Sequence, residues 1–135
     1  MREPVGITRA ALPHVSQADE LQVRTDAFAD RCIALAKALP DTPLIRRIAG
    51  QFQDAATSVG ANYRAARRAK SRADFTSKIG TVSEEADETV YWLKRLQNSG
   101  IDERGLLTPL LQEAEQLARI FGAAHRTALR RRKAR

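Results

Sequence analysis

Apolar residues recur at every third or fourth position along four separate stretches of this 135-residue chain. Because an α-helix turns once every 3.6 residues, that spacing places the apolar residues on one helix face. We find no stretch with the strict apolar–polar alternation that marks a half-buried strand. The pattern predicts an all-α protein whose four amphipathic helices lie at about residues 18–39, 43–69, 72–98 and 103–129, with either Asp102 or Thr108 at the start of the last one.

Residues that favour helix ends lie between these stretches. Thr42 can cap the second helix, and Pro43 suits its first position, where a backbone N–H would have no partner. Ser71 and Asp74 have the spacing of a capping box, and Gly100 suits the left-handed residue after a helix. Since the connections are short, we expect the helices to form an up-down-up-down antiparallel four-helix bundle.

The two ends of the chain lack the helical pattern. Residues 1–17 hold two prolines and one glycine without a sustained period, which predicts a flexible N-terminal arm. Residues 130–135 are mostly basic and have too few apolar side chains to be held against a core, so we expect a basic tail that frays. Between them, residues 18–129 have the length of one domain.

The second stretch carries a heptad-like apolar seam with one polar member. Its positions are Ile45, Ile48, Phe52, Ala55, Val59, Asn62, Ala66 and Ala69. A lone buried asparagine often fixes register or oligomeric state, whereas a local bend would turn the Asn62 amide to solvent or to a backbone carbonyl. Gly50 and Gly60 lie in the same helix, where glycine costs about 1 kcal/mol relative to alanine. We expect both glycines to permit a close helix approach or a bend.

Three aromatic residues are candidates for contacts beyond the core. Tyr63, Tyr91 and Trp92 have flat faces on which nucleic-acid bases can stack, although packing in the bundle or between subunits is the favoured interpretation. Together with Asn62, they are the residues that we expect to specify the bundle or the oligomer.

Positive charge is concentrated in two blocks. The chain has a formal net charge of +7, and residues 42–72 hold seven Arg and Lys residues against one Asp. Residues 106–135 hold seven against two acidic residues, whereas residues 73–105 hold four against seven. Such blocks attract polyanions, but a solvated helix end or ion pairs with a neighbouring subunit would explain them as well. The candidate nucleic-acid-binding residues are Arg64, Arg67, Arg68, Lys70, Arg72, Arg130, Arg131 and Arg132.

The sequence contains no motif that indicates catalysis. Cys32 is the single cysteine and lies on an apolar helix face, and neither His14 nor His125 has a partner at metal-ligand spacing. The acidic run at residues 84–88 lacks the Glu-x-x-His pairs of a di-iron bundle. We therefore expect no enzyme activity, no cofactor and no metal. No apolar run reaches the ~18 residues of a membrane span and no secretory signal is apparent, so we expect no membrane contact and a cytoplasmic location.

Two blocks of the sequence resemble a known family. The first is SVGANYR, from Ser58 to Arg64, and the second runs from Asp74-Phe75 through Lys78 and Glu85-Ala86 to Tyr91-Trp92-Leu93. Both blocks occur in this order in the four-helix bundle protein family, also called the 23S rRNA intervening-sequence protein family. The resemblance covers roughly residues 21–125. Ala65 stands where the family commonly has an acidic residue, which makes this chain more basic there.

The resemblance implies a four-helix bundle that assembles as a ring, typically a pentamer, without a known enzymatic activity. Some members of the family are encoded within intervening sequences of large-subunit ribosomal RNA. A similar protein, the accessory variability determinant of diversity-generating retroelements, is a basic pentamer that binds nucleic acid and a reverse transcriptase.

From the charge pattern and the resemblance together, we expect a non-enzymatic, ring-forming protein that binds RNA or DNA or assists a nucleoprotein complex. A reverse transcriptase or another acidic protein is expected as a further partner. The alternative is a protein–protein scaffold or adaptor with no nucleic-acid role.

Overall fold

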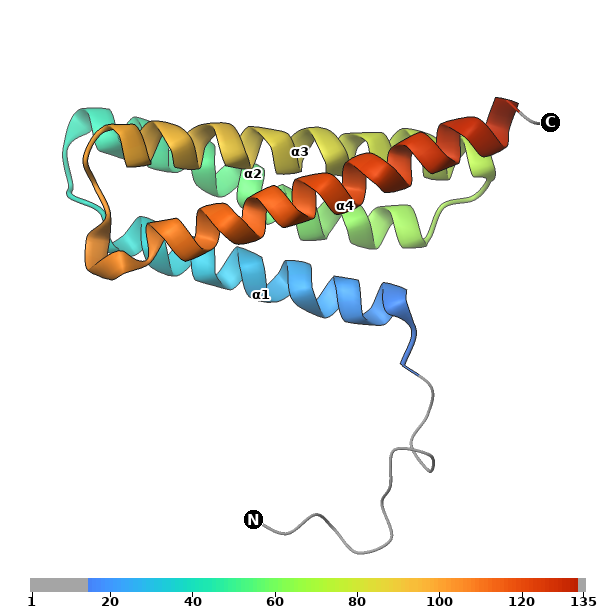
Figure 1. The fold of residues 1–135 in the computed structure, drawn as a ribbon, viewed down its shortest axis with the longest axis horizontal. Coiled ribbons are helices and arrows are strands. Elements are labelled where there is room, and N and C mark those ends of the chain that lie inside the picture. The colour runs from blue at the N-terminus through green and yellow to red at the C-terminus, as the bar shows by residue number, and fades with distance from the viewer. Residues whose placement is uncertain (1–14, 134–135) are drawn as a thin grey trace, which may run out of the picture.

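The four expected helices are present and form a bundle. A computed structural model describes residues 15–133, so residues 1–14 of the expected arm (1–17) and the last two residues lie outside the described part. The arm's expected end at residue 17 is wrong, because Ser16 caps α1 and Gln17 begins it. The helices are α1 (Gln17–Ala38), α2 (Pro43–Arg67), α3 (Arg72–Asn98) and α4 (Leu107–Lys133), with a short 3₁₀ helix, η2 (Glu103–Gly105), ahead of α4. Successive helices run in opposite directions and each packs beside the next (Figure 1). The predicted all-α four-helix bundle is confirmed.

Polar caps and a left-handed glycine set the helix ends. The Thr42 hydroxyl accepts a hydrogen bond of 3.2 Å from a backbone N–H of the first turn of α2, and Pro43 occupies the first position as predicted. Gly100 has a φ of +81° directly after the cap of α3, the conformation expected there. At the start of α1, Ser16 and Asp19 form a full capping box, in which each side chain accepts a hydrogen bond from the other residue's N–H.

The core runs the length of the bundle and takes one stripe of side chains from every helix. Its largest fully buried members are Phe28, Leu35, Phe52, Val59, Ile79, Val82, Leu93, Leu96, Leu107, Leu110, Leu117 and Phe121. On α2 the buried stripe passes through Tyr63 rather than Asn62, and Ala69 lies beyond the end of the helix. The predicted seam is wrong at Asn62 because a straight helix drifts by about 20° per heptad away from a seven-residue repeat, and it is wrong at Ala69 because α2 ends at Arg67.

Glycines permit close contacts between the helices. Of the two glycines that the sequence indicated, Gly50 and Gly60, only Gly60 lies at such a contact. A Cβ atom at Gly60 would lie 3.2 Å from side-chain oxygens of α1, so α1 and α2 approach closely there. A Cβ atom at Gly50 would meet nothing within 4 Å, so the expected close approach at that residue is wrong. The tightest contact is instead at Gly80 in α3, where a Cβ atom would lie 2.8 Å from Nε2 of His125 in α4.

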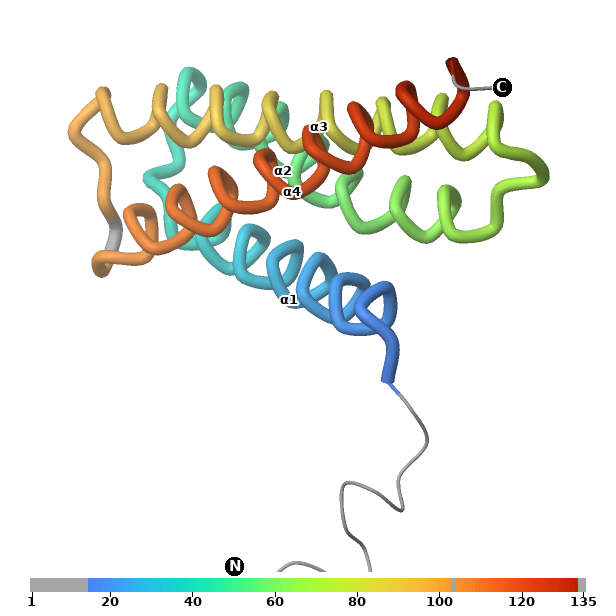
Figure 2. Tube along the Cα trace, turned by 45° about the vertical axis from the view of Figure 1, so that its right-hand side comes forward, coloured from blue at the N-terminus to red at the C-terminus, as the bar shows by residue number. Residues whose placement is uncertain are grey.

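α1 has the fewest contacts with the rest of the bundle. It packs along α2 but contacts α4 at few positions, whereas α3 packs extensively against both α2 and α4. Figures 1 and 2 show α1 angled away from α4 at the end where α1 begins. Where the two helices lie close, Arg24 donates to both carboxylate oxygens of Glu113 at 2.7 Å, and this bonding raises the pKa of Arg24. The divergence leaves one end of the bundle open.

The last helix starts later and ends later than the sequence predicts. Two residues with positive φ, Arg104 (56°) and Gly105 (68°), turn the chain ahead of α4, so the expected start at residue 103 is wrong. The helix continues to Lys133, so residues 130–133 are helical where we expected a frayed tail. Arg and Lys are good helix formers, and positive charges at a helix C-terminus interact favourably with its dipole.

Candidate nucleic-acid interface

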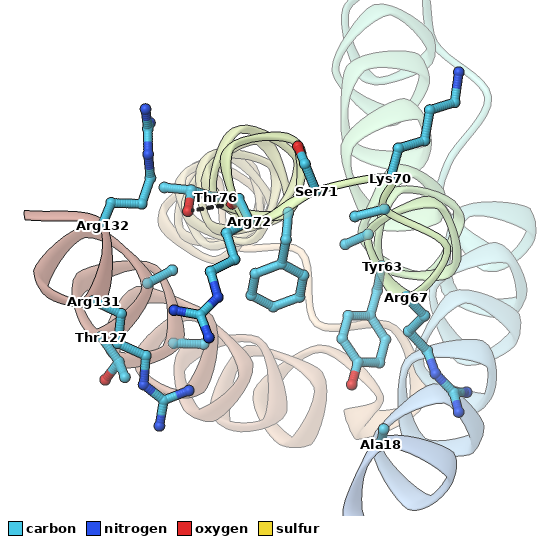
Figure 3. A pocket seen from close by; sticks show the side chains of 15 residues that line it. Ala18, Tyr63, Arg67, Lys70, Ser71, Arg72, Thr76, Thr127, Arg131 and Arg132 are labelled. Carbon is cyan, nitrogen blue, oxygen red and sulfur yellow. Dashed lines mark hydrogen bonds between the residues drawn. The ribbon is translucent and has the colours of Figure 1, made fainter. Parts of the chain in front are cut away.

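A pocket opens at the end of the bundle where α1 and α4 diverge. It has a volume of about 1200 Å³, and its walls come from all four helices and from the turn between α2 and α3 (Figure 3). The residues around it, which we call the basic pocket, are Ala18, Tyr63, Ala66, Arg67, Ala69, Lys70, Ser71, Arg72, Phe75, Thr76, Ala124, Thr127, Ala128, Arg131 and Arg132. Five of them are Arg or Lys and none is Asp or Glu, so the two basic blocks of the sequence meet here.

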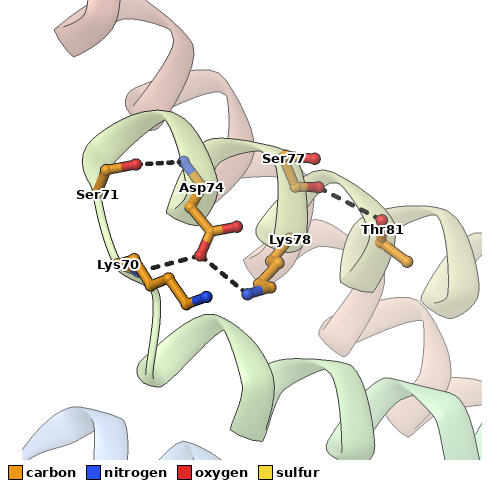
Figure 4. A network of polar contacts seen from close by, with 6 residues as sticks. All are labelled: Lys70, Ser71, Asp74, Ser77, Lys78 and Thr81. Carbon is orange, nitrogen blue, oxygen red and sulfur yellow. Dashed lines mark hydrogen bonds and ion pairs between the residues drawn. The ribbon is translucent and has the colours of Figure 1, made fainter.

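The turn between α2 and α3 is held by one carboxylate. Asp74 Oδ2 accepts hydrogen bonds from the Lys70 backbone N–H at 3.0 Å and from the Lys78 Nζ at 2.9 Å, and the Asp74 N–H donates to the Ser71 hydroxyl (Figure 4). The Lys78 bond, followed by the Lys70 bond, lowers the pKa of Asp74 below its usual range. Because the turn is fixed on both sides, Arg72 is held at the first position of α3, beside the pocket.

The five cations of the pocket are not equivalent. Figure 3 shows the Arg72 side chain extending toward α4, on the side where Arg131 lies, whereas the side chains of Lys70 and Arg132 point away from the centre. Among residues 15–133, neither Arg72 nor Arg131 has a carboxylate partner. These two arginines are therefore the cations best placed to bind an anion inside the pocket.

Arg67 is already paired within the chain. Its guanidinium lies 2.6 Å from the Asp19 carboxylate of α1, and this hydrogen bond is the main reason that the pKa of Asp19 is lowered. The pair bridges α1 and α2 at the edge of the pocket. The charges of Arg67 and Asp19 largely cancel, so the unpaired positive charge of the basic pocket lies on the side that α3 and α4 form.

Three of the predicted basic residues lie outside the pocket. Arg64 and Arg68 are exposed near the end of α2, and Arg130 donates a 3.3 Å hydrogen bond to the Thr127 hydroxyl on α4. The structure thus brings together Arg67, Lys70, Arg72, Arg131 and Arg132 from the predicted set.

Part of the pocket lining is apolar, which the sequence did not indicate; we call Tyr63, Phe75 and Ala128 its apolar floor. Tyr63 is 7% exposed, and its ring packs at 5.2 Å from the ring of Phe121, so this tyrosine lies in the core of the bundle. Burial raises the pKa of the Tyr63 hydroxyl. Phe75 lines the pocket, is only half-buried, and packs against the edge of the core.

The other candidates for bundle or oligomer specificity lie away from the pocket. The Asn62 amide donates to the Ser58 carbonyl at 2.9 Å, which is the backbone contact that we weighed against a register role. Tyr91 is 50% exposed, contacts the Trp92 ring edge-on at 5.0 Å, and lies under the Arg95 guanidinium at 4.8 Å. Within the described residues, the buried Trp92 indole N–H has no hydrogen-bond acceptor.

Metal-ligating side chains and the lone cysteine were both candidates for chemistry. The side chains that the structure describes form no cluster of three or more His, Cys, Asp or Glu residues that could hold a metal ion. Cys32 is fully buried, and burial raises the pKa of its thiol far above the usual range, so it stays protonated and unreactive. Of the helices in this same part of the chain, none is both long and apolar enough to cross a membrane.

The acidic residues of α3 form a second charged feature, outside the pocket. Glu84, Glu85, Asp87 and Glu88 make no ion pair with any Lys or Arg of residues 15–133. Burial, and then repulsion from its acidic neighbours, raises the pKa of Glu85. This acidic stripe is therefore available to a basic partner.

Comparisons with known proteins agree with the fold and with the sequence blocks. A similar solved structure, 28% identical, is a protein of unknown function from the S23 ribosomal protein family of Bacteroides thetaiotaomicron. The similarity covers 78% of this chain and 97% of that protein, with a TM-score of 0.71. No curated protein matches the chain. Residues 20–123 match the family described as 23S rRNA-intervening sequence protein, and the chain therefore belongs to that family.

Proposed function

We propose that this protein is a non-enzymatic, ring-forming helical bundle that binds RNA or DNA, or assists a nucleoprotein complex, through the basic pocket. The observation that carries the proposal is the meeting of two distant basic blocks in one pocket without a carboxylate in its lining. Arg72 and Arg131 supply guanidinium groups, which match phosphate oxygens bidentately. Lys70 and Arg132 add positive charge around the opening.

A ring explains how one small pocket per subunit would give useful affinity. Each copy offers only a few unpaired cations, but several copies on one assembly would bind a single strand together and raise the overall avidity. We propose a pentamer because the family resemblance implies one. A reverse transcriptase is proposed as a further partner for the same reason. We place the protein in the cytoplasm, because its one cysteine, Cys32, leaves no disulfide to form within the chain.

Salt-dependent titrations test the proposal. Fluorescently labelled RNA and DNA should bind at low salt, and the affinity should fall steeply as salt rises, because bound phosphates release their counterions. Arg131→Gln should weaken binding to every sequence and reduce the salt slope by about one contact. Arg47→Gln is the matched control, because Arg47 is an exposed arginine at the opposite end of the bundle. Absence of binding to any nucleic acid at low salt would remove the proposal.

The unpaired acidic stripe of α3 favours a second candidate, the protein–protein scaffold. In that case the basic pocket would receive acidic side chains of a neighbouring subunit or of another acidic protein. Arg131→Glu separates the two functions: the scaffold predicts a change in oligomer size by analytical ultracentrifugation, whereas nucleic-acid binding predicts an intact ring without affinity. Arg67→Glu is less informative, because it would also break the pair with Asp19 inside the subunit.

A further inference from the structure

We infer that the basic pocket takes unpaired nucleotides, with a base of single-stranded RNA or DNA against the apolar floor and the adjoining phosphates on Arg72 and Arg131. This inference rests on the proposed function and goes further, because it names the form of nucleic acid and the atoms that the site reads. It depends on the floor of the pocket rather than on its charge.

The floor offers more than a phosphate backbone needs. Phosphate binding requires only cations at the surface, and those would serve equally well on a flat helix face. Here the cations surround a hollow of about 1200 Å³ whose floor includes Phe75, Tyr63 and Ala128. The basic pocket exceeds the 300–1,000 Å³ that is common for sites that bind small molecules, but it shares with them apolar side chains beside polar groups.

A base fits this combination of surfaces. Bases stack on aromatic rings and on arginine planes without regard to sequence, and Phe75 is half-buried, so part of its ring surface faces the pocket. Arg72 extends over the same opening from the first turn of α3 (Figure 3). In a duplex the bases are paired and stacked inside the helix, so they cannot enter a pocket. The floor therefore favours single strands.

Other occupants match the pocket less well. Residues 1–14 precede α1 in the sequence, but they hold Arg2 and Arg9 against Glu3, and their net positive charge opposes a site with five cations. An acidic helix of another protein would match the charge, but it carries its acidic groups on one face and its apolar side chains on another. A nucleotide presents a flat apolar base and an anionic phosphate side by side, as the pocket requires.

The test compares three labelled probes with the same number of phosphates: a single strand of pyrimidine nucleotides, a duplex of half that length, and a single strand in which abasic sites replace the bases. Fluorescence anisotropy with the full chain should give an affinity about 5- to 150-fold higher for the intact single strand than for the abasic one, the effect expected of one stacked base. Phe75→Leu keeps an apolar side chain but removes the ring. It should lower the affinity for the intact strand toward that of the abasic strand and leave abasic binding unchanged.

Each other outcome has a defined meaning. Equal binding of the intact and abasic strands, with a loss on Arg131→Gln, would overturn the base pocket and leave the proposed function standing. Displacement of the labelled strand by polyglutamate as readily as by unlabelled strand would show that carboxylates suffice, which also overturns it. No binding of any probe would remove both proposals. Phe75→Tyr is the folding control, because it retains a ring and should retain the preference for bases.

Discussion

The contact between Gly80 and His125 gives the sharpest stability prediction. Gly80 lies inside α3, where alanine would normally stabilise the helix by about 1 kcal/mol. A Cβ atom there would lie 2.8 Å from Nε2, 3.2 Å from Cε1 and 3.3 Å from Cδ2 of the His125 ring. Since the ring must move to admit a methyl group, we expect Gly80→Ala to carry an overpacking cost of about 1–3 kcal/mol. The net effect should be a loss of up to about 2 kcal/mol.

Gly50→Ala is the matched control within the same bundle. Gly50 is an exposed residue inside α2, and a Cβ atom there would meet nothing within 4 Å. It should therefore show the unopposed helix gain of up to about 1 kcal/mol. Gly80→Ala should show a similar gain once His125 has been replaced by alanine, which gives a coupling energy of about 1–3 kcal/mol between the two positions.

The assay is urea unfolding followed by circular dichroism, with all variants at one protein concentration, because the stability of an oligomer depends on concentration. The free energy of unfolding is compared for wild type, both glycine variants, His125→Ala and the double variant. If Gly80→Ala stabilised the protein as much as Gly50→Ala does, or if the cycle were additive within about 0.5 kcal/mol, the close helix contact would be refuted.

Three further predictions use the same assay. Phe121→Ala should lower the free energy of unfolding by about 3–5 kcal/mol, because Phe121 is fully buried; a loss below about 1 kcal/mol would contradict its place in the core. Thr42→Ala should cost about 1 kcal/mol through the lost cap of α2, and Thr42→Ser should restore most of it. Asp19 has its pKa lowered from 3.8, chiefly by Arg67, so this pair should stabilise the fold at neutral pH and lose its effect as the pH falls through and below 3.8. The stability difference between wild type and Arg67→Gln should shrink over that range. A difference that grew on acidification would contradict a stabilising pair between Arg67 and ionised Asp19.

Local chemistry made much of the fold predictable from the sequence. Thr42-Pro43 and Gly100 act through their own backbone preferences and through neighbours one turn away, so their roles did not depend on the rest of the molecule. The apolar spacing fixed which face of each helix is buried. The apolar spacing failed at Asn62 and Tyr63. An α-helix has about 3.6 residues per turn, whereas a seven-residue repeat corresponds to about 3.5, and this difference accumulates along a helix as long as α2.

Contacts between helices were harder to predict from the sequence. Nothing local distinguishes Gly50 from Gly80, since the difference lies in whether another helix crosses at that level. The same limit applies to the candidate site. The basic residues could be named individually, but their convergence depends on the antiparallel order of α2, α3 and α4.

Both ends of the described fold lie at the same end of the bundle as the basic pocket. α1 begins there and α4 finishes there, whereas the turns from α1 to α2 and from α3 to α4 lie at the opposite end (Figure 1). An affinity tag fused ahead of α1 or after α4 would therefore sit beside the opening, and a histidine-rich or acidic tag could compete with a ligand for the arginines. Labels for spectroscopy are better attached in the turn at residues 99–101, and purification tags are best cleaved before any ligand is measured.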